Sequence, residues 1–120
     1  MSIEIQEEAT GKIVVVRVSG KLTAEDYERF LPEIEQLVDR RGKIRILFEM
    51  EDFHGWDLAA GWEDLKFGIR HYKDIERLAA VGDKAWEHAM TTLWRPFTSA
   101  EVRYFDRSEA EQARRWIEAE

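Results

Sequence analysis

Short segments that alternate between hydrophobic and polar residues are interspersed along the chain with longer segments of helical periodicity. Near the start, residues 3–6 alternate between isoleucine and polar side chains, and residues 13–18 form a run rich in β-branched residues. Both patterns are typical of β-strands, and the intervening residues 9–11 contain a glycine that favours a turn. The first part of the sequence therefore predicts a β-hairpin.

A long helix is predicted to follow this hairpin. Thr23 and Asp26 have the spacing of a capping box, in which each side chain binds the backbone N–H of the other residue. Pro32 lies inside the predicted helix and should kink it, but the hydrophobic stripe continues past this residue. The stripe has a spacing of three or four residues, which predicts one buried face: Tyr27, Phe30, Leu31, Ile34, Leu37 and Val38.

The rest of the chain continues this alternation of strands and helices. Strands are predicted at 43–49, 75–82 and 102–105, and helices at 58–72, from Asp83 to Pro96, and after Ser108. A helix between two strands of one sheet implies a right-handed crossover between parallel strands. We therefore expect an α/β fold with a five-stranded, mostly parallel sheet that begins with a hairpin.

Each of the four later strands carries an arginine on the side opposite its hydrophobic residues: Arg17, Arg45, Arg77 and Arg103. A parallel sheet covered on both faces should have strands that are hydrophobic throughout. We therefore expect all four helices to lie on one face, and the arginine face to be partly exposed with Glu49 and Glu101 as ion-pair partners. Hydrophobic residues also lie on the arginine face, which favours a homodimer through it: Ile13, Val15, Leu47, Ala79, Val81 and Phe105.

Composition narrows the class of protein. The 120 residues are enough for one domain, which we expect to span 1–120, and 44% of them are hydrophobic. A net charge of −7 disfavours binding to nucleic acid and to anionic membranes. The absence of cysteine excludes disulfides and thiolate metal sites, and the longest hydrophobic runs are too short to span a membrane. We expect a cytoplasmic protein without membrane insertion.

Three segments carry a family likeness, at residues 55–68, 80–86 and 101–106. In this order they resemble the SpoIIAA-like family, whose domains are related to STAS and CRAL-TRIO domains. The resemblance implies a superhelix of βα units with the helices on one face of the sheet, and it implies no reaction. In phosphorylated STAS domains a serine follows the third strand, in a pattern such as Asp-Ser-Ser-Gly. Residues 52–55 read Asp52-Phe53-His54-Gly55 and lack the hydroxyl that serine phosphorylation requires, so we expect no serine phosphoswitch.

Ligands of open parallel sheets bind outside the carboxyl ends of the strands, where helix N-termini favour anionic groups. The predicted strand-end loops are 20–23, 52–57, 82–84 and 106–108. The candidate ligand-binding residues in and beside them are Lys21, His54, Trp56, Asp57, Asp83, Lys84 and Trp86. A structural interpretation stays open for several: Asp57, Asp83 and Ser108 are suited to cap helices, and Trp56, Trp62 and Trp86 to fill the core.

Catalysis has little support in the sequence. The motifs of hydrolases, phosphate-binding loops and zinc proteases are absent, and nothing brings His54, His71 and His88 together as metal ligands. We therefore expect a non-enzymatic binding or regulatory domain without cofactor or metal, which binds an apolar small molecule or lipid beneath the third predicted helix. The alternatives are a STAS-type adaptor that binds a protein partner and, less favoured, a small enzyme.

Overall fold

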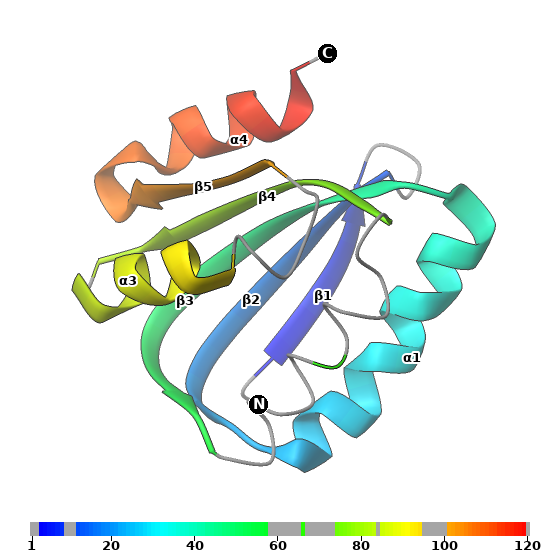
Figure 1. Cartoon of the computed structure of the whole chain (residues 1–120), viewed down its shortest axis with the longest axis horizontal. Coiled ribbons are helices and arrows are strands. Elements are labelled where there is room, and N and C mark those ends of the chain that lie inside the picture. Colours follow the sequence, from blue (N-terminus) through cyan, green and yellow to red (C-terminus); the bar gives the residue numbers. More distant parts are fainter. Residues whose placement is uncertain are drawn as a thin grey trace.

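Five strands form one mixed sheet in the order β1-β2-β3-β4-β5 (Figure 1). A computed structural model describes residues 3–8, 12–57, 66, 74–83, 85–94 and 101–119. The strands are β1 (Ile3–Glu8), β2 (Ile13–Leu22), β3 (Ile44–Trp56), β4 (Ile75–Gly82) and β5 (Glu101–Asp106). The first two are antiparallel and every later neighbour is parallel, which confirms the predicted hairpin and the mostly parallel sheet.

The described helices are α1 (Ala24–Arg41), α3 (Ala85–Trp94) and α4 (Ala110–Glu118), with a 3₁₀ turn η3 (Arg107–Glu109) before α4. The predicted helix at 58–72 lies outside the described residues, apart from Lys66, which is helical. Within the described residues, no helix combines the length and hydrophobicity needed to cross a bilayer.

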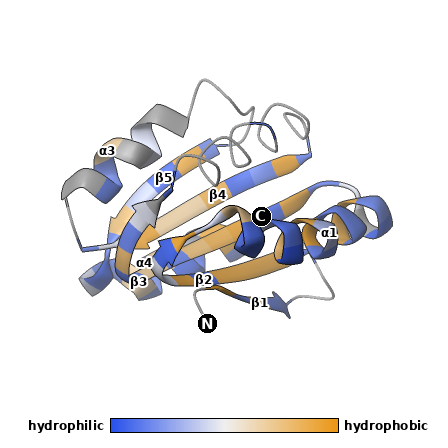
Figure 2. Cartoon of the chain, turned by 90° about the horizontal axis from the view of Figure 1, so that it is seen from below, coloured by the Kyte–Doolittle hydropathy of each residue, from blue (hydrophilic) through white to orange (hydrophobic). Residues whose placement is uncertain are grey.

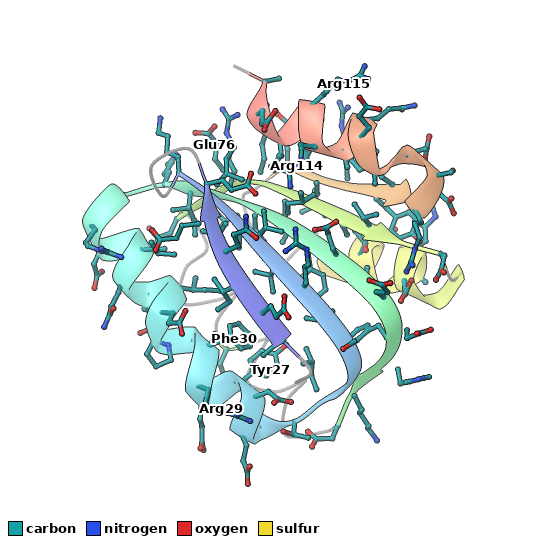
Figure 3. All side chains as sticks on the ribbon, turned by 180° about the vertical axis from the view of Figure 1, so that it is seen from behind. Tyr27, Arg29, Phe30, Glu76, Arg114 and Arg115 are labelled. Carbon is teal, nitrogen blue, oxygen red and sulfur yellow. The ribbon has the colours of Figure 1, made fainter. Side chains whose placement is uncertain are left out.

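The start of α1 agrees with its sequence signals. Thr23 is the N-cap, and its side chain and that of Asp26 form the predicted capping box. Pro32 lies inside the helix, which continues to Arg41 and is followed by Gly42 with φ 77°, a left-handed conformation that glycine adopts without strain. Tyr27 and Phe30 face the sheet with their ring centroids 4.8 Å apart, whereas Arg29 points outward (Figure 3).

The main core lies between α1 and one face of the sheet. The buried stripe of α1 packs there against alternate residues of β2 and β3, such as Val14, Val16 and Ile46. Phe48, Leu78 and Tyr104 are partly buried against the same cluster. The predicted hydrophobic alternation of the strands is therefore confirmed.

The opposite face of the sheet is covered by α4, so the prediction that all helices lie on one face was wrong. Ala113 and Ile117 of α4 are fully buried in a second cluster with Ile13, Val15, Leu47, Ala79 and Val81 of the strands. The central strand β2 is largely hydrophobic, whereas α4 is mainly hydrophilic apart from this side (Figure 2). These strand residues are the ones expected to mediate a homodimer, and α4 of the same chain covers them instead.

Chain connectivity explains the difference. The rule of right-handed crossovers fixes the side of a helix only when that helix connects two parallel strands. The helix α1 lies between β2 and β3, and α3 lies between β4 and β5. No strand follows α4 in the described chain, so it is free to cover the face that α1 leaves open.

The arginines of this face hold the carboxyl end of α4. Arg45 Nη1 donates to the carbonyl oxygen of Ile117 at 2.9 Å, and Arg77 Nη1 donates to that of Trp116 at 2.9 Å. Both guanidinium groups also donate to the carbonyl oxygen of Ala119. The last carbonyls of a helix have no partner within it and lie at the negative end of its dipole, so two cations stabilise the end of α4.

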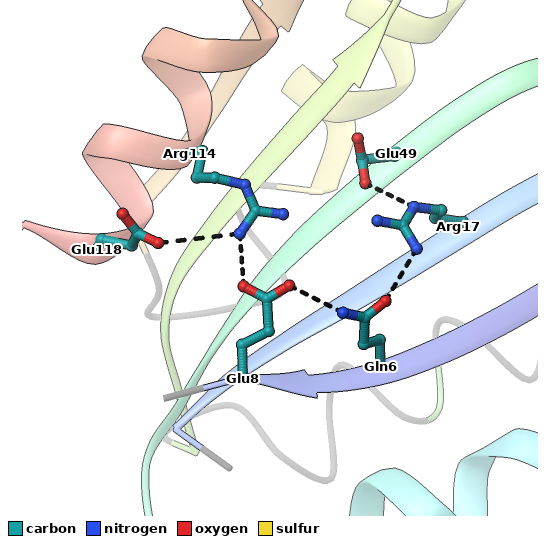
Figure 4. A network of polar contacts seen from close by, with 6 residues as sticks. All are labelled: Gln6, Glu8, Arg17, Glu49, Arg114 and Glu118. Carbon is teal, nitrogen blue, oxygen red and sulfur yellow. Dashed lines mark hydrogen bonds and ion pairs between the residues drawn. The ribbon is translucent and has the colours of Figure 1, made fainter. Parts of the chain in front are cut away.

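A further group of polar side chains on this face forms a connected network (Figure 4). Arg17 binds Glu49 and Gln6, each at 3.1 Å, which confirms Glu49 as the predicted ion-pair partner. Glu8 accepts hydrogen bonds from Gln6 and from Arg114 of α4. This network ties α4 to the edge strand β1.

Candidate binding surface at the carboxyl ends of the strands

The strands do not end level with one another at their carboxyl ends. The pairing of β3 with β4 stops at Glu49 and Val81, but β3 continues to Trp56 beside β2. Beyond Glu49, therefore, β2 and β3 form a two-stranded ribbon that separates from β4 (Figure 1).

Left-handed backbone conformations occur along this ribbon. Gly20 and Gly55 have φ of 64° and 95°, and Asp52 has φ of 47°, a region that aspartate enters more readily than most residues. The register of β2 against β3 shifts on both sides of Gly20, which is the mark of a β-bulge. Bulges bend a strand and redirect its side chains, so the ribbon presents a surface that a regular strand would not.

Two of the predicted site residues lie exposed on this ribbon. Lys21 pairs with Gly55, which adjoins His54, and both Lys21 and His54 are exposed. Asp57 is half-buried, and its backbone N–H donates to the carbonyl of Leu22 at 3.0 Å. The side chains of Trp56 and Trp86 and all of Lys84 lie outside the description, so their predicted roles stay predictions.

Phe53, which lies between Asp52 and His54, is fully buried in the main core. Its ring meets that of Phe48 edge to face, with centroids 6.4 Å apart. Phe53 therefore anchors the ribbon, whereas its exposed neighbours Asp52 and His54 are accessible to a partner.

Arg107 occupies the region where β3 leaves β4. Its Nη2 donates to the carbonyl oxygen of Met50 at 2.9 Å and lies 3.6 Å from Asp83 Oδ2, while Nη1 lies 3.8 Å from Glu51. One guanidinium group thus connects the middle of β3, where this strand leaves β4, with the carboxyl ends of β4 and β5. The predicted loop 106–108 contains this residue, but its partner is 57 positions away, and nothing in the local sequence indicates that contact.

Polar groups are also buried beneath α3. Glu87 and Thr91 are each 1% exposed, and Glu87 Oε1 accepts a hydrogen bond from the backbone N–H of Asp83 at 3.0 Å. Gly82 allows this approach, because a Cβ atom there would lie 2.2 Å from Glu87 Oε1 and 3.1 Å from the Tyr104 hydroxyl. Burial, followed by the negative charges of Glu87 and of two aspartates, raises the pKa of Tyr104 to about 12.

The turn into α4 is capped at a different position from the one predicted. Ser108 was expected to cap the last helix, but Asp106 caps η3 in a capping box with Glu109, and α4 has no side-chain cap. Hydrogen bonds from the backbone and side chain of Ser108 lower the pKa of Asp106. The 3₁₀ turn moves the cap two residues toward the N-terminus.

The described surface therefore combines exposed charged groups with a ribbon of two paired strands. No group of three or more histidine, aspartate or glutamate side chains in the described residues could hold a metal ion.

Comparisons with known proteins agree with this geometry. A family model described as SpoIIAA-like matches residues 13–118. A solved structure of an uncharacterized DUF3478-family protein with a SpoIIAA-like fold, from Shewanella loihica, is 30% identical, with a TM-score of 0.78 over 96% of this chain and 91% of that one. The anti-sigma factor antagonist SpoIIAA in its unphosphorylated form is 14% identical, with a TM-score of 0.63 over 96% and 99%, a likeness of fold alone. No curated protein matches the sequence.

Proposed function

Because the chain belongs to the SpoIIAA-like family, we propose that it is a non-catalytic, cytoplasmic binding domain of STAS type whose ligand is another protein. The family fold is consistent with a non-enzymatic domain of this type. One solved structure with this fold is described as an anti-sigma factor antagonist, which gives a precedent for a regulatory role. The proposed contact surface is the β2–β3 ribbon, residues 19–22 and 50–57, together with Asp83 and Arg107.

The exposed side chains of the ribbon carry this proposal. Lys21, Glu51, Asp52 and His54 are exposed on a backbone that is paired along β2 and β3 and anchored by the buried Phe53. A preorganised surface loses little conformational freedom on association, which favours binding. Charged groups of both signs on such a surface also give selectivity among protein partners.

The alternative of an apolar small molecule or lipid beneath α3 has less support. Two residues of α3 with buried side chains, Glu87 and Thr91, are both polar. A space beneath α3 would therefore be lined in part by a carboxylate and a hydroxyl, and an apolar ligand would offer these groups no hydrogen bond. We therefore favour the protein partner.

The test is affinity capture from native lysate with quantitative mass spectrometry, using the full chain and a Lys21→Glu/His54→Glu variant. Recovery of a specific partner should fall at least about tenfold in the variant, since reversed charge at an interface opposes the approach of that partner. A Glu28→Lys variant, altered on an exposed position of α1, is the matched control and should retain the partner. Circular dichroism verifies that each variant is folded.

Equal recovery by the ribbon variant and the unaltered chain would refute the proposed surface. A lipid or fatty acid extracted in stoichiometric amount from the native protein, with no ribbon-dependent partner, would favour the apolar ligand instead.

A further inference from the structure

A groove runs between the helix α1 and the edge strand β1, which lie beside each other (Figure 1). Its volume is about 150 Å³. Pockets that bind small molecules usually enclose about 300–1,000 Å³, so this groove is too small for a cofactor and has room for a single side chain. The residues that line it are Ile5 and Glu7 of β1 and Glu33, Gln36, Leu37 and Arg40 of α1.

The floor of the groove is hydrophobic and well anchored. Leu37 is only 2% exposed and belongs to the main core, and Ile5 packs against the same cluster. The groove therefore lies between two elements that the core holds in place. A hydrophobic floor of this kind suits the methylene stem of a long side chain whose charged end reaches the rim.

The rim of the groove is charged. Glu7 and Glu33 are both exposed, one from the strand and one from the helix. Within the described part of the chain neither of them forms an ion pair, whereas the adjacent Glu8 is paired with Arg114. Arg40 also lines the groove, and its Nε donates to a backbone carbonyl of its own helix at 3.4 Å. Two carboxylates and one guanidinium give the lining a charge of −1, in a chain of net charge −7.

We propose that this groove binds an arginine side chain from a segment of a protein partner. The stem of that arginine lies on Ile5 and Leu37, and its guanidinium binds the carboxylates of Glu7 and Glu33. A guanidinium offers five N–H donors in a planar fork and is less strongly hydrated than an ammonium, so it suits carboxylates supplied by two elements above a hydrophobic floor. The side-chain carbonyl of Gln36 is a further acceptor at the same groove.

The groove acts as one anchor point within a larger contact. Exposed ion pairs contribute little binding energy, so an isolated arginine should bind weakly. Anchor residues of protein interfaces are often arginines that fill a pocket while neighbouring contacts exclude water. The groove shares no residue with the β2–β3 ribbon, and this inference does not depend on the partner proposed there.

The test is a titration of the full, isotope-labelled chain with a capped Gly-Arg-Gly peptide, followed by amide chemical shifts in NMR spectra at low ionic strength. Amides of residues 5–8 and 33–40 should shift in a saturable manner, with a dissociation constant in the millimolar range. The same peptide with citrulline, in which an uncharged urea replaces the guanidinium, should give no saturable shift. Added salt should weaken the binding of the arginine peptide, because it screens exposed charges.

Two variants of the groove should change the affinity in opposite directions. Glu33→Gln removes a carboxylate and should raise the dissociation constant about two- to fivefold, the range expected for one exposed ion pair. Arg40→Gln removes the cation of the lining and should lower the dissociation constant by a similar factor. Glu28→Gln is the matched control, since Glu28 is exposed on α1 but does not line the groove, and it should leave the dissociation constant within about 1.5-fold.

Three results would overturn the proposal. The first is the absence of saturable shifts at peptide concentrations up to about 20 mM, which would detect even weak binding. The second is an equal response to the citrulline peptide, which would show that the guanidinium is not recognised. The third is a dissociation constant that Glu33→Gln and Arg40→Gln leave unchanged, or shifts confined to residues away from the groove.

Discussion

Replacing Ile117 by alanine tests the position of α4 most directly. Ile117 is fully buried, and it packs with Ala113 against Val15 and Leu47 on the face of the sheet opposite α1. Truncation of a buried isoleucine to alanine destabilises proteins by about 2–5 kcal/mol, through lost burial and the cavity that remains. Alanine favours helix slightly more than isoleucine, by about 0.4 kcal/mol, which offsets a small part. We expect a loss of about 2–4 kcal/mol.

The assay is urea unfolding followed by circular dichroism, with the free energy extrapolated to water. The midpoint should fall while the m-value stays constant, because the extent of surface exposed on unfolding is nearly unchanged. In a thermal scan, the same loss corresponds to a decrease of roughly 8–16 °C for a domain of this size. Arg115→Ala is the matched control, since Arg115 lies on the outer side of α4 with 71% of its side chain exposed (Figure 3).

The control should change the free energy of unfolding by no more than about 0.5 kcal/mol, as expected for an exposed ion pair. If Ile117→Ala has as small an effect as Arg115→Ala, α4 does not pack on the sheet. The arginine face would then not be covered by α4.

Three further predictions follow from buried and charged groups. Gly82→Ala should lower the free energy of unfolding by about 1–3 kcal/mol, measured by urea unfolding, because the new methyl group collides with Glu87. The absorbance titration of Tyr104, isolated as the difference from Tyr104→Phe, should have its midpoint near pH 12, and a midpoint near 10 would show that the ring is not desolvated. Since this pKa is raised, the neutral phenol contributes stability that is complete below about pH 10 and is lost as pH rises toward 12. The hydrogen bond from Arg45 lowers the pKa of Glu76 below its ordinary value of 4.5, so the stability contributed by the ionised Glu76 is present above pH 4.5 and is lost on acidification. The variant Glu76→Gln should reduce the acid-induced fall in melting temperature, and an unchanged pH profile would contradict this.

Local patterns predicted the strands and the first helix well. The β-branched run of β2 and the Thr23–Asp26 capping box reflect preferences and interactions of residues close in sequence. The cap of the last turn was harder to predict, because Asp106 with Glu109 and Ser108 with Glu111 have the same spacing. The 3₁₀ geometry of η3 selects the first pair, and sequence does not distinguish it.

The position of α4 depends on contacts between distant parts of the chain. Arg45 and Arg77 alternate with hydrophobic residues, which normally indicates a solvent-exposed face. Both donate hydrogen bonds to backbone carbonyls at the end of a helix more than 35 residues away. Every residue has a backbone carbonyl, so the sequence does not indicate such a partner. A charged residue in a parallel strand can thus bind the end of a packed helix instead of being exposed to solvent.

The candidate surface was predicted in part. Lys21 and His54 were singled out because of their loop and strand-end positions, and both are exposed in the structure, while their role in binding stays a prediction. The contribution of Arg107 was missed because it acts through the Met50 carbonyl across the gap between β3 and β4. Glu87 was missed for the opposite reason, since a glutamate in the first turn of a helix is usually exposed, and only the space at Gly82 lets it turn inward.

Closure of the second face by α4 has a consequence for biosynthesis. Translation proceeds from the N-terminus, and α4 is made after every strand on which it packs. Until then the ribosome-bound chain presents the side chains of Val15, Leu47 and Val81 to the surroundings, because the segment that shields them is still being made. The nascent protein therefore exposes hydrophobic side chains that are buried in the folded protein. Chaperones can bind these side chains until α4 has been synthesised.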